Sequence, residues 1–364
     1  MRPVNSLGVW GRVGILFALQ IAKSASKPFP AKSFTQWPSS YAALGDSYAA
    51  GAGAGEPIVF SCGRFSEAYP VHVAHSKYLN LSDANVNYLA CGGSDSRSVL
   101  FHQVPFIERS DVITITVGGN EVHFFAVLNA CVYQWLPFST CEREVAEARA
   151  LIESRGLIHK IDAVISESVK KKRSDALLFV TGYARFFNEQ TDLCDHITFS
   201  RTKPLGYLTK EKRRALNQLV SMLNDVIRAS ADLHGAKYVD IDGLYEGHRF
   251  CEEGVQEPDL GRDDTWFFNL PAAEFQTEAQ GGSLHSAAEI SGNSESLQQQ
   301  FKVNQLQPVT SNGREGGGTL SFPDLETART FHPTTFGHVA IADILVKEIW
   351  KSKQYHRRGL GCEV

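Results

Sequence analysis

Several features that mark other protein classes are missing or scarce in this chain of 364 residues. Its 36 Lys and Arg do not outnumber its 40 Asp and Glu, so no basic surplus exists to displace counterions from nucleic acid. No Gly-Lys-Ser/Thr sequence is present to form a P-loop, and no two cysteines have the C-x-x-C spacing of a common zinc site. We therefore expect no nucleic-acid partner, no metal and no cofactor. The chain is also too apolar, at 43%, for wholesale disorder, and it can bury a large core.

Long hydrophobic runs are equally scarce. The only one of note, Val13–Ala22, follows the basic residues Arg2 and Arg12 and precedes small residues at 24–26. This order of basic, apolar and small residues is typical of a secretory signal, and the run is shorter than the roughly 20 residues that span a bilayer. We predict a signal peptide over residues 1–26 and a secreted protein without a stable membrane anchor. A buried N-terminal helix is the alternative.

Seven cysteines are present, and an oxidising environment outside the cell would allow six of them to pair. Six cysteines allow about fifteen pairings, of which we favour the sequential one because each bond then closes a modest loop. It pairs Cys62 with Cys91, Cys131 with Cys141, and Cys194 with Cys251, and it leaves Cys362 unassigned. Asn80-Leu81-Ser82 is an acceptor triplet for N-glycosylation.

Short apolar runs alternate with helical patterns along most of the chain. This alternation predicts an α/β fold with a mostly parallel sheet that helices cover on both faces. The predicted strands are Tyr41–Leu44, Val86–Ala90, Val112–Val117, Leu177–Thr181 and Tyr238–Ile241, and the predicted helices are Tyr69–Leu79, Glu142–Lys172, Thr209–Leu233 and Thr335–Trp350.

One long segment does not fit this alternation. Residues 272–321 are rich in Gly, Ser, Gln, Asn and Glu and show little periodicity. Such a composition buries too little apolar area to offset its ordering entropy, so we expect a disordered insertion, with a flap over the site as the alternative. The resulting organisation is a domain over residues 36–350 that this insertion interrupts, followed by a tail at 351–364.

Chemically capable residues follow three of the predicted strands. Gly45-Asp46-Ser47-Tyr48, Cys91-Gly92-Gly93-Ser94 and Gly118-Gly119-Asn120 each come after a strand, and His332-Pro333 precedes the last predicted helix. Because the carboxyl ends of parallel strands share one edge of a sheet, these residues can converge there. A serine, a histidine, an amide and glycine backbone at one edge are the parts of an acyl-transfer site.

Four segments in this order, GDSYAAGAG, ACGGSDS, VGGNE and FHPTTFGH, resemble the four blocks of the SGNH (GDSL-type) hydrolases. The likeness is greatest to the branch of secreted esterases typified by a streptomycete esterase, with which GYARFFN, GHRFCE and DTWF also agree. It covers roughly residues 40–270 and 322–350. The resemblance implies a three-layer α/β/α sandwich with a five-stranded sheet.

The resemblance also implies roles for individual residues. Ser47 would be the nucleophile and His332 its general base, since a serine hydroxyl needs a base within hydrogen-bond reach. Many members carry an aspartate three residues before the histidine, where this chain has Arg329. Because an arginine side chain cannot accept a hydrogen bond, the backbone carbonyl of Arg329 is the expected orienting group, with Asp324 as a substitute. His338 is expected to be a packed helix residue.

The oxyanion hole would comprise the backbone N–H of Ser47, the backbone N–H of Gly93 and the side-chain amide of Asn120. Each of these residues also has a structural interpretation. Gly45-Asp46-Ser47 can be a turn that caps a helix, Gly93 can be turn punctuation, and Asn120 can be a capping asparagine. Each structural interpretation is tenable by itself. The presence of all these motifs in one chain, in the order of the family's blocks, favours the hydrolase.

We therefore expect a secreted, monomeric serine hydrolase that cleaves carboxylic esters, an esterase or lipase acting on a small-molecule or lipid ester. Two alternatives stay open. The fold can carry a catalytically silent protein that binds carbohydrate or lipid, because fold alone does not settle function. The same mechanism can also serve an acetyl esterase that acts on polysaccharide.

Overall fold

The computed structural model describes residues 38–79, 81–107, 109–134, 139–200, 203, 205–258, 263–269 and 328–359. All of them belong to one unit of the chain, Gln36–Val364. Asn80, Asp324, Cys362, the predicted signal peptide and the insertion at 272–321 lie outside the described residues.

The centre of the fold is a five-stranded sheet in which every neighbouring pair is parallel. The order across the sheet is β4 (Val86–Tyr88), β1 (Tyr41–Gly45), β5 (Val112–Thr116), β6 (Leu177–Thr181) and β7 (Lys237–Val239). Strands β1 and β5 are buried at every position, as expected of strands that helices cover on both faces. The predicted parallel sheet and its five strands are confirmed.

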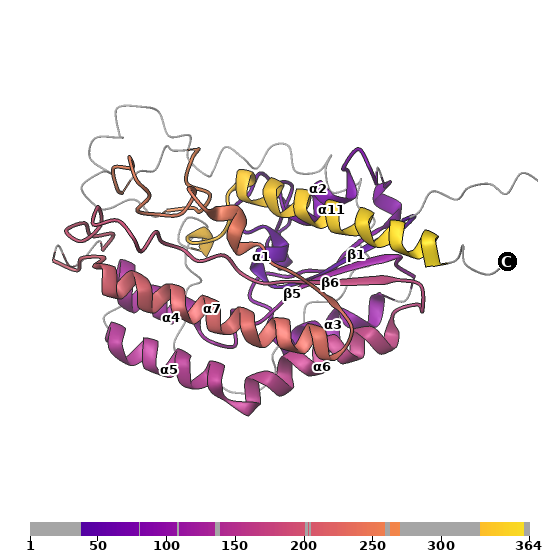
Figure 1. Ribbon diagram of the computed structural model, residues 1–364, viewed down its shortest axis with the longest axis horizontal. Helices are drawn as coiled ribbons and strands as arrows, with labels where there is room; N and C mark the ends of the chain where they lie inside the picture. The colour runs from indigo at the N-terminus through magenta and orange to yellow at the C-terminus, as the bar shows by residue number, and fades with distance from the viewer. Residues whose placement is uncertain are drawn as a thin grey trace, which may run out of the picture. The chain divides into compact units, whose positions relative to one another are not determined.

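Helices form a layer on each face of this sheet (Figure 1). One layer contains α2 (Tyr69–Ala74) and α11 (Thr335–Gly359), which pack together, and the other contains α3 (Ser96–His102), α5 (Cys141–Glu153), α6 (Arg155–Lys171) and α7 (Lys210–Leu233). The three-layer α/β/α arrangement is confirmed. Short elements complete the described fold: α1 (Ser47–Ala50), η1 (Phe60–Cys62), η2 (Asp83–Asn85), η3 (Val104–Phe106), α4 (Phe124–Leu128), η4 (Asn129–Tyr133), η5 (Asp242–Tyr245), and a ribbon of β2 (Pro57–Val59) and β3 (Arg64–Phe65).

Three predicted helices have different bounds in the structure. The predicted helix Glu142–Lys172 is two helices, because Ser154 is extended (ψ 141°) and its hydroxyl accepts the Leu157 N–H at 3.2 Å, which caps a new helix. Helix α2 ends at Ala74 rather than Leu79, since the Ser76 hydroxyl accepts the Leu79 N–H in a turn. Helix α11 continues past Trp350 to Gly359, into the predicted tail.

The strand order shows where along the sheet a ligand is expected to bind. The chain passes from β1 to β4 on one side and then to β5 on the other, so the order of strands reverses between β1 and β5. In open parallel sheets this reversal leaves a crevice at the carboxyl ends of the two strands, where ligands bind. Ser47 follows β1 and Gly118-Gly119-Asn120 follow β5, so both lie at that point.

Among the described residues, none of the helices combines the length and the apolar character that crossing a bilayer requires.

Candidate active site

A tight turn after β1 presents Ser47. Gly45 has φ +139°, and a Cβ there would lie 2.2 Å from the Thr116 carbonyl oxygen, so only glycine fits. Asp46 then caps α1 by accepting the Tyr48 N–H at 3.0 Å. The capping role of Asp46 and the presentation of Ser47 are thus compatible. Within residues 41–50, all of them described, Ser47 is the most exposed residue, and it lines a pocket that is partly open to solvent.

The structure brings Ser47 and His332 together although 285 positions separate them. The Nε2 atom of His332 lies 2.7 Å from the Ser47 Oγ. On the other side of the ring, Nδ1 lies 3.2 Å from the Thr330 carbonyl oxygen. With Nδ1–H donating to that carbonyl, Nε2 is left unprotonated and able to accept the serine proton.

The carbonyl expected to orient this histidine is that of Arg329, and the structure places the Thr330 carbonyl beside the ring as well. The Arg329 carbonyl accepts the backbone N–H of His332 at 2.9 Å, while the ring contacts Thr330. Phe331, between Thr330 and His332, has the left-handed φ of 62°. Both carbonyls favour the protonated ring, Thr330 more than Arg329.

Burial sets the protonation state of His332. Removal from water disfavours the imidazolium and lowers the pKa of His332 from 6.5 to about 4, against the smaller opposing effect of the two carbonyls. The ring is therefore neutral at neutral pH. A neutral imidazole at 2.7 Å from a serine hydroxyl is the arrangement that general-base catalysis requires.

His338, as expected, is a packed residue of α11. It is fully buried, and its Nδ1 accepts the Tyr69 N–H at 3.3 Å at the start of α2. This contact joins the two helices of one layer.

The three residues expected to form the oxyanion hole are only partly brought together. Ser47 is the first residue of α1, and the first N–H groups of a helix have no acceptor within it. Asn120 lines the same pocket as Ser47 and His332, and its Nδ2 donates to the Ser94 carbonyl at 2.9 Å, which leaves its second amide hydrogen to point elsewhere. Gly93 is exposed, has φ +75°, and is not among the residues that line this pocket.

The pocket beside Ser47 encloses about 630 Å³, part of it open to solvent. Asp46, Ser47, Asn120 and His332 lie at its polar end. Aromatic and aliphatic side chains form most of the remaining wall: Tyr48, Phe124, Phe125, Leu128, Tyr133, Tyr183, Phe186, Ala328 and Phe331. An apolar chain fits such a wall, with its reactive end at the polar group.

Asp46 is the second titratable group at the polar end whose pKa is perturbed. It is 2% exposed, and burial raises its pKa from 3.8 to about 7, although hydrogen bonds from Tyr183 and from the Tyr48 N–H oppose the rise. Glu121 adds a smaller repulsion in the same direction. The Asp46 carboxyl beside Ser47 therefore gains or loses its negative charge close to neutral pH.

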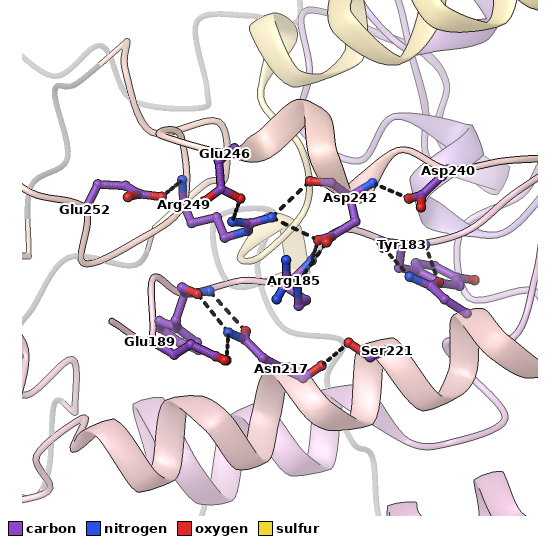
Figure 2. A network of polar contacts seen from close by, with 12 residues as sticks. Tyr183, Arg185, Glu189, Asn217, Ser221, Asp240, Asp242, Glu246, Arg249 and Glu252 are labelled. Atoms are coloured by element: carbon purple, nitrogen blue, oxygen red, sulfur yellow. Dashed lines mark hydrogen bonds and ion pairs between the residues drawn. The ribbon is translucent and has the colours of Figure 1, made fainter. Parts of the chain in front are cut away.

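A polar network holds the chain that follows β6, which carries Phe186 of the pocket wall (Figure 2). Arg185 donates to Asp242 through its backbone N–H at 2.7 Å and its Nε at 2.8 Å. Arg249 joins from the other side, donating to Asp242 and to Glu246. Asn217 of α7 exchanges hydrogen bonds with the backbone of Phe187. The wall therefore rests on buried and partly buried polar contacts as well as on apolar packing.

Three disulfides tie the described chain, in sequential order. They join Cys62 to Cys91, Cys131 to Cys141, and Cys194 to Cys251. The second fastens the middle of η4, which supplies Tyr133 to the pocket, to the start of α5. Within the described residues, no group of His, Cys, Asp or Glu is arranged to hold a metal ion.

Sequence reasoning missed three contributors to this site: the Thr330 carbonyl, the perturbed Asp46 and Tyr183. A signal for Tyr183 was available. Asn217 and Asn224 stand seven residues apart on the apolar face of α7 and are buried there. Polar residues on a buried helix face need partners, and theirs are the backbone groups of Phe187 and Tyr183. No comparable sequence pattern predicts that the Thr330 carbonyl contacts the His332 ring.

Comparison with known proteins agrees with this geometry. Residues 43–285 match the GDSL-like Lipase/Acylhydrolase family. Lipase 1 of Streptomyces coelicolor is 31% identical over 245 residues, which cover 66% of this chain and 84% of that protein.

Two solved structures share the fold. A phospholipase A1 from Streptomyces albidoflavus and an extracellular lipase from Streptomyces rimosus each superpose with a TM-score of 0.56 at 24% identity, covering 84% of this chain and 98% of theirs. The parallel sheet, the paired Ser47 and His332, and a family match over most of the chain lead to one conclusion. The chain belongs to the GDSL-like lipase/acylhydrolase family and is a carboxylic ester hydrolase.

Proposed function

We propose that this protein is a secreted esterase or lipase that cleaves carboxylic esters through an acyl-enzyme on Ser47, with His332 as the general base. The observation that carries the proposal is the distance of 2.7 Å between Ser47 Oγ and His332 Nε2 at the polar end of an apolar pocket. The same contact argues against a catalytically silent binding protein, which needs no nucleophile held against a neutral base.

The reaction follows from these positions. As Ser47 Oγ attacks the ester carbonyl carbon, His332 Nε2 takes its proton, and the negative charge that forms on the carbonyl oxygen is stabilised by N–H donors. The Ser47 N–H and the free hydrogen of the Asn120 amide are our candidates for these donors. His332 then protonates the departing alcohol. A water molecule, deprotonated by His332, releases the acid and restores Ser47.

The lining of the pocket supports an acyl chain longer than acetyl. Phe124, Leu128 and Phe186 present an apolar surface next to Ser47, and each methylene that leaves water there contributes about 0.8 kcal/mol. Relatives described as lipases and as a phospholipase A1 support a lipid ester as substrate. We propose a lipid or other medium-to-long acyl ester, rather than acetylated polysaccharide.

Export is the second part of the proposal. Three disulfides support an oxidising compartment, as does the description of the Streptomyces rimosus relative as extracellular. The basic, apolar and small order of residues 1–26 supports the same destination.

Labelling by a fluorophosphonate probe tests the nucleophile. Wild-type protein should be labelled and should hydrolyse p-nitrophenyl butyrate, and Ser47→Ala should lose both activities. Ser221→Ala is the matched control, because that hydroxyl bonds only within its own helix, to the Asn217 carbonyl at 3.2 Å. Wild-type protein that is folded yet neither labelled nor active would disprove the proposal.

A panel of p-nitrophenyl esters of increasing acyl length tests the substrate class. We expect kcat/KM to rise by up to about fourfold per methylene until the pocket is filled, which is the factor that about 0.8 kcal/mol represents. Leu128→Trp, which fills the pocket, should move the preferred acyl length toward acetate. A wild-type preference for acetate over every longer ester would instead favour the acetyl esterase.

A further inference from the structure

Tyr183 links the two turns on which the proposed chemistry depends. Its hydroxyl oxygen accepts the Gly119 N–H at 2.9 Å, and its hydroxyl hydrogen goes to Asp46 Oδ2. Gly119 precedes Asn120 in the turn after β5, and Asp46 precedes Ser47 in the turn after β1. One hydroxyl therefore bridges the segment of the nucleophile and the segment of the candidate oxyanion donor.

The Tyr183 ring is itself fixed in place. The Asn224 side chain accepts the Tyr183 N–H at 2.8 Å and donates to the Tyr183 carbonyl at 2.8 Å. This pairing holds the backbone of Tyr183 against α7, and the residue is only 2% exposed. A hydroxyl on so constrained a ring can define the separation of the groups that it joins.

Tyr48 extends the arrangement to the histidine. Its ring packs edge-on against Tyr183, with 5.0 Å between the ring centroids, and its hydroxyl donates to the Phe331 carbonyl at 2.9 Å. Phe331 holds a left-handed φ of 62°, which a bulky residue keeps only when its surroundings impose it. The Tyr48 bond is such a restraint, one residue before His332.

We propose that Tyr183 and Tyr48 are positioning residues: their hydroxyls hold the Gly119-Asn120 turn and the Phe331-His332 segment in register with Ser47. The inference rests on the proposed function; both rings line the pocket, and the role assigned to these residues belongs to their hydroxyls, which bond to protein groups. Its physical basis is that an error of about 1 Å in the placement of reacting groups can cost on the order of 10²-fold in rate.

Tyr183→Phe tests the first bond, because it removes one oxygen and keeps the ring. We expect kcat for a p-nitrophenyl ester to fall by about 10- to 100-fold while KM changes by less than about threefold, since the pocket wall is intact. Tyr41→Phe is the matched control: its hydroxyl is also buried and hydrogen-bonded, to Thr114 of the neighbouring strand β5 at 2.7 Å. That variant should keep wild-type kcat. Equal losses of kcat in both variants would overturn the proposal.

A double-mutant cycle separates positioning from a general loss of structure. If Tyr183 acts through the turn that carries Asn120, then Tyr183→Phe should cost little in an Asn120→Ala background, where the amide is already gone. A full loss of rate in that background, or no loss in Tyr183→Phe alone, would overturn the proposal. Circular dichroism and melting temperature identify the variants that remain folded.

Tyr48→Phe tests the second bond independently of the first. We expect slower acylation, measured as the rate of labelling by the fluorophosphonate, and we expect this effect to vanish in a His332→Ala background. An unchanged labelling rate in Tyr48→Phe would remove Tyr48 from the proposal. Failure of these tests is distinct from failure of the proposed function, because Ser47→Ala would still abolish labelling if Ser47 is the nucleophile.

Discussion

The acid side of the pH profile is the sharpest consequence of the partial burial of His332. His332 must be neutral to accept the Ser47 proton, and burial lowers the pKa of His332 from 6.5 to about 4. This lowering of the pKa corresponds to about 3 kcal/mol of free energy in favour of the neutral ring, because each tenfold change in the ionisation equilibrium is worth roughly 1.4 kcal/mol. We therefore expect kcat/KM to persist into acid and to fall with a midpoint near 4 rather than near 6.5.

The difference is large enough to measure at about pH 5.5. A ring with the lowered pKa would be about 97% neutral there, whereas a ring with the ordinary pKa would be about 9% neutral. The assay is kcat/KM for an uncharged ester such as p-nitrophenyl butyrate, which reports ionisations of the free enzyme. A return to full activity after transfer to neutral pH shows that the protein stayed folded.

Asp46→Asn is the control that shows whether His332 or Asp46 causes the fall of kcat/KM in acid. Asp46 also lies beside Ser47, but its pKa is raised to about 7, so its ionisation falls elsewhere in the profile. The variant keeps a good helix cap, since asparagine caps as well as aspartate. It should remove any inflection near 7 and retain the limb near 4. An acid limb with a midpoint near 6.5 in the wild type would refute the reasoning from burial.

Three further predictions concern stability. Because burial raises the pKa of Asp46, its protonated form is favoured in the folded chain, so the stability it contributes is present below about 4 and lost as pH rises to about 7. The melting temperature of Asp46→Asn, relative to that of the wild type, should therefore increase as the pH rises from 4 to 7. A difference between the two that stays constant over this range would contradict this. Arg213 is fully buried and donates to Asp195 and to the carbonyls of Leu208 and Thr191, so Arg213→Ala should cost about 3–5 kcal/mol in urea unfolding. A loss of stability below about 1 kcal/mol would show that water molecules hydrogen-bond to Asp195 and these carbonyls in the variant. Reduction of the three disulfides should lower the melting temperature by several degrees, since a native bridge contributes roughly 2–5 kcal/mol, and an unchanged value after verified reduction would oppose this.

Much of the architecture could be predicted because it depends on local patterns. The runs at Tyr41, Val112 and Leu177 are apolar and bounded by turn residues, so their strands follow from burial on both faces. Once the strands are parallel, the residues after them must share an edge, and Ser47 and Asn120 do so. The break at Ser154 was missed because apolar periodicity continues across it, although Ser and Gly156 are both signals of a helix end.

The details of the site were decided by tertiary structure. The Thr330 carbonyl lies at the His332 ring next to Phe331, whose left-handed φ could not be predicted from a phenylalanine in the sequence. Burial of Asp46 and His332 shifts their pKa values in opposite directions, and burial depends on every element packed around them. The sequence by itself determined the strands and the chemical groups at their ends. Only the folded chain decided their orientation and charge, because both arise from contacts between segments far apart in the sequence.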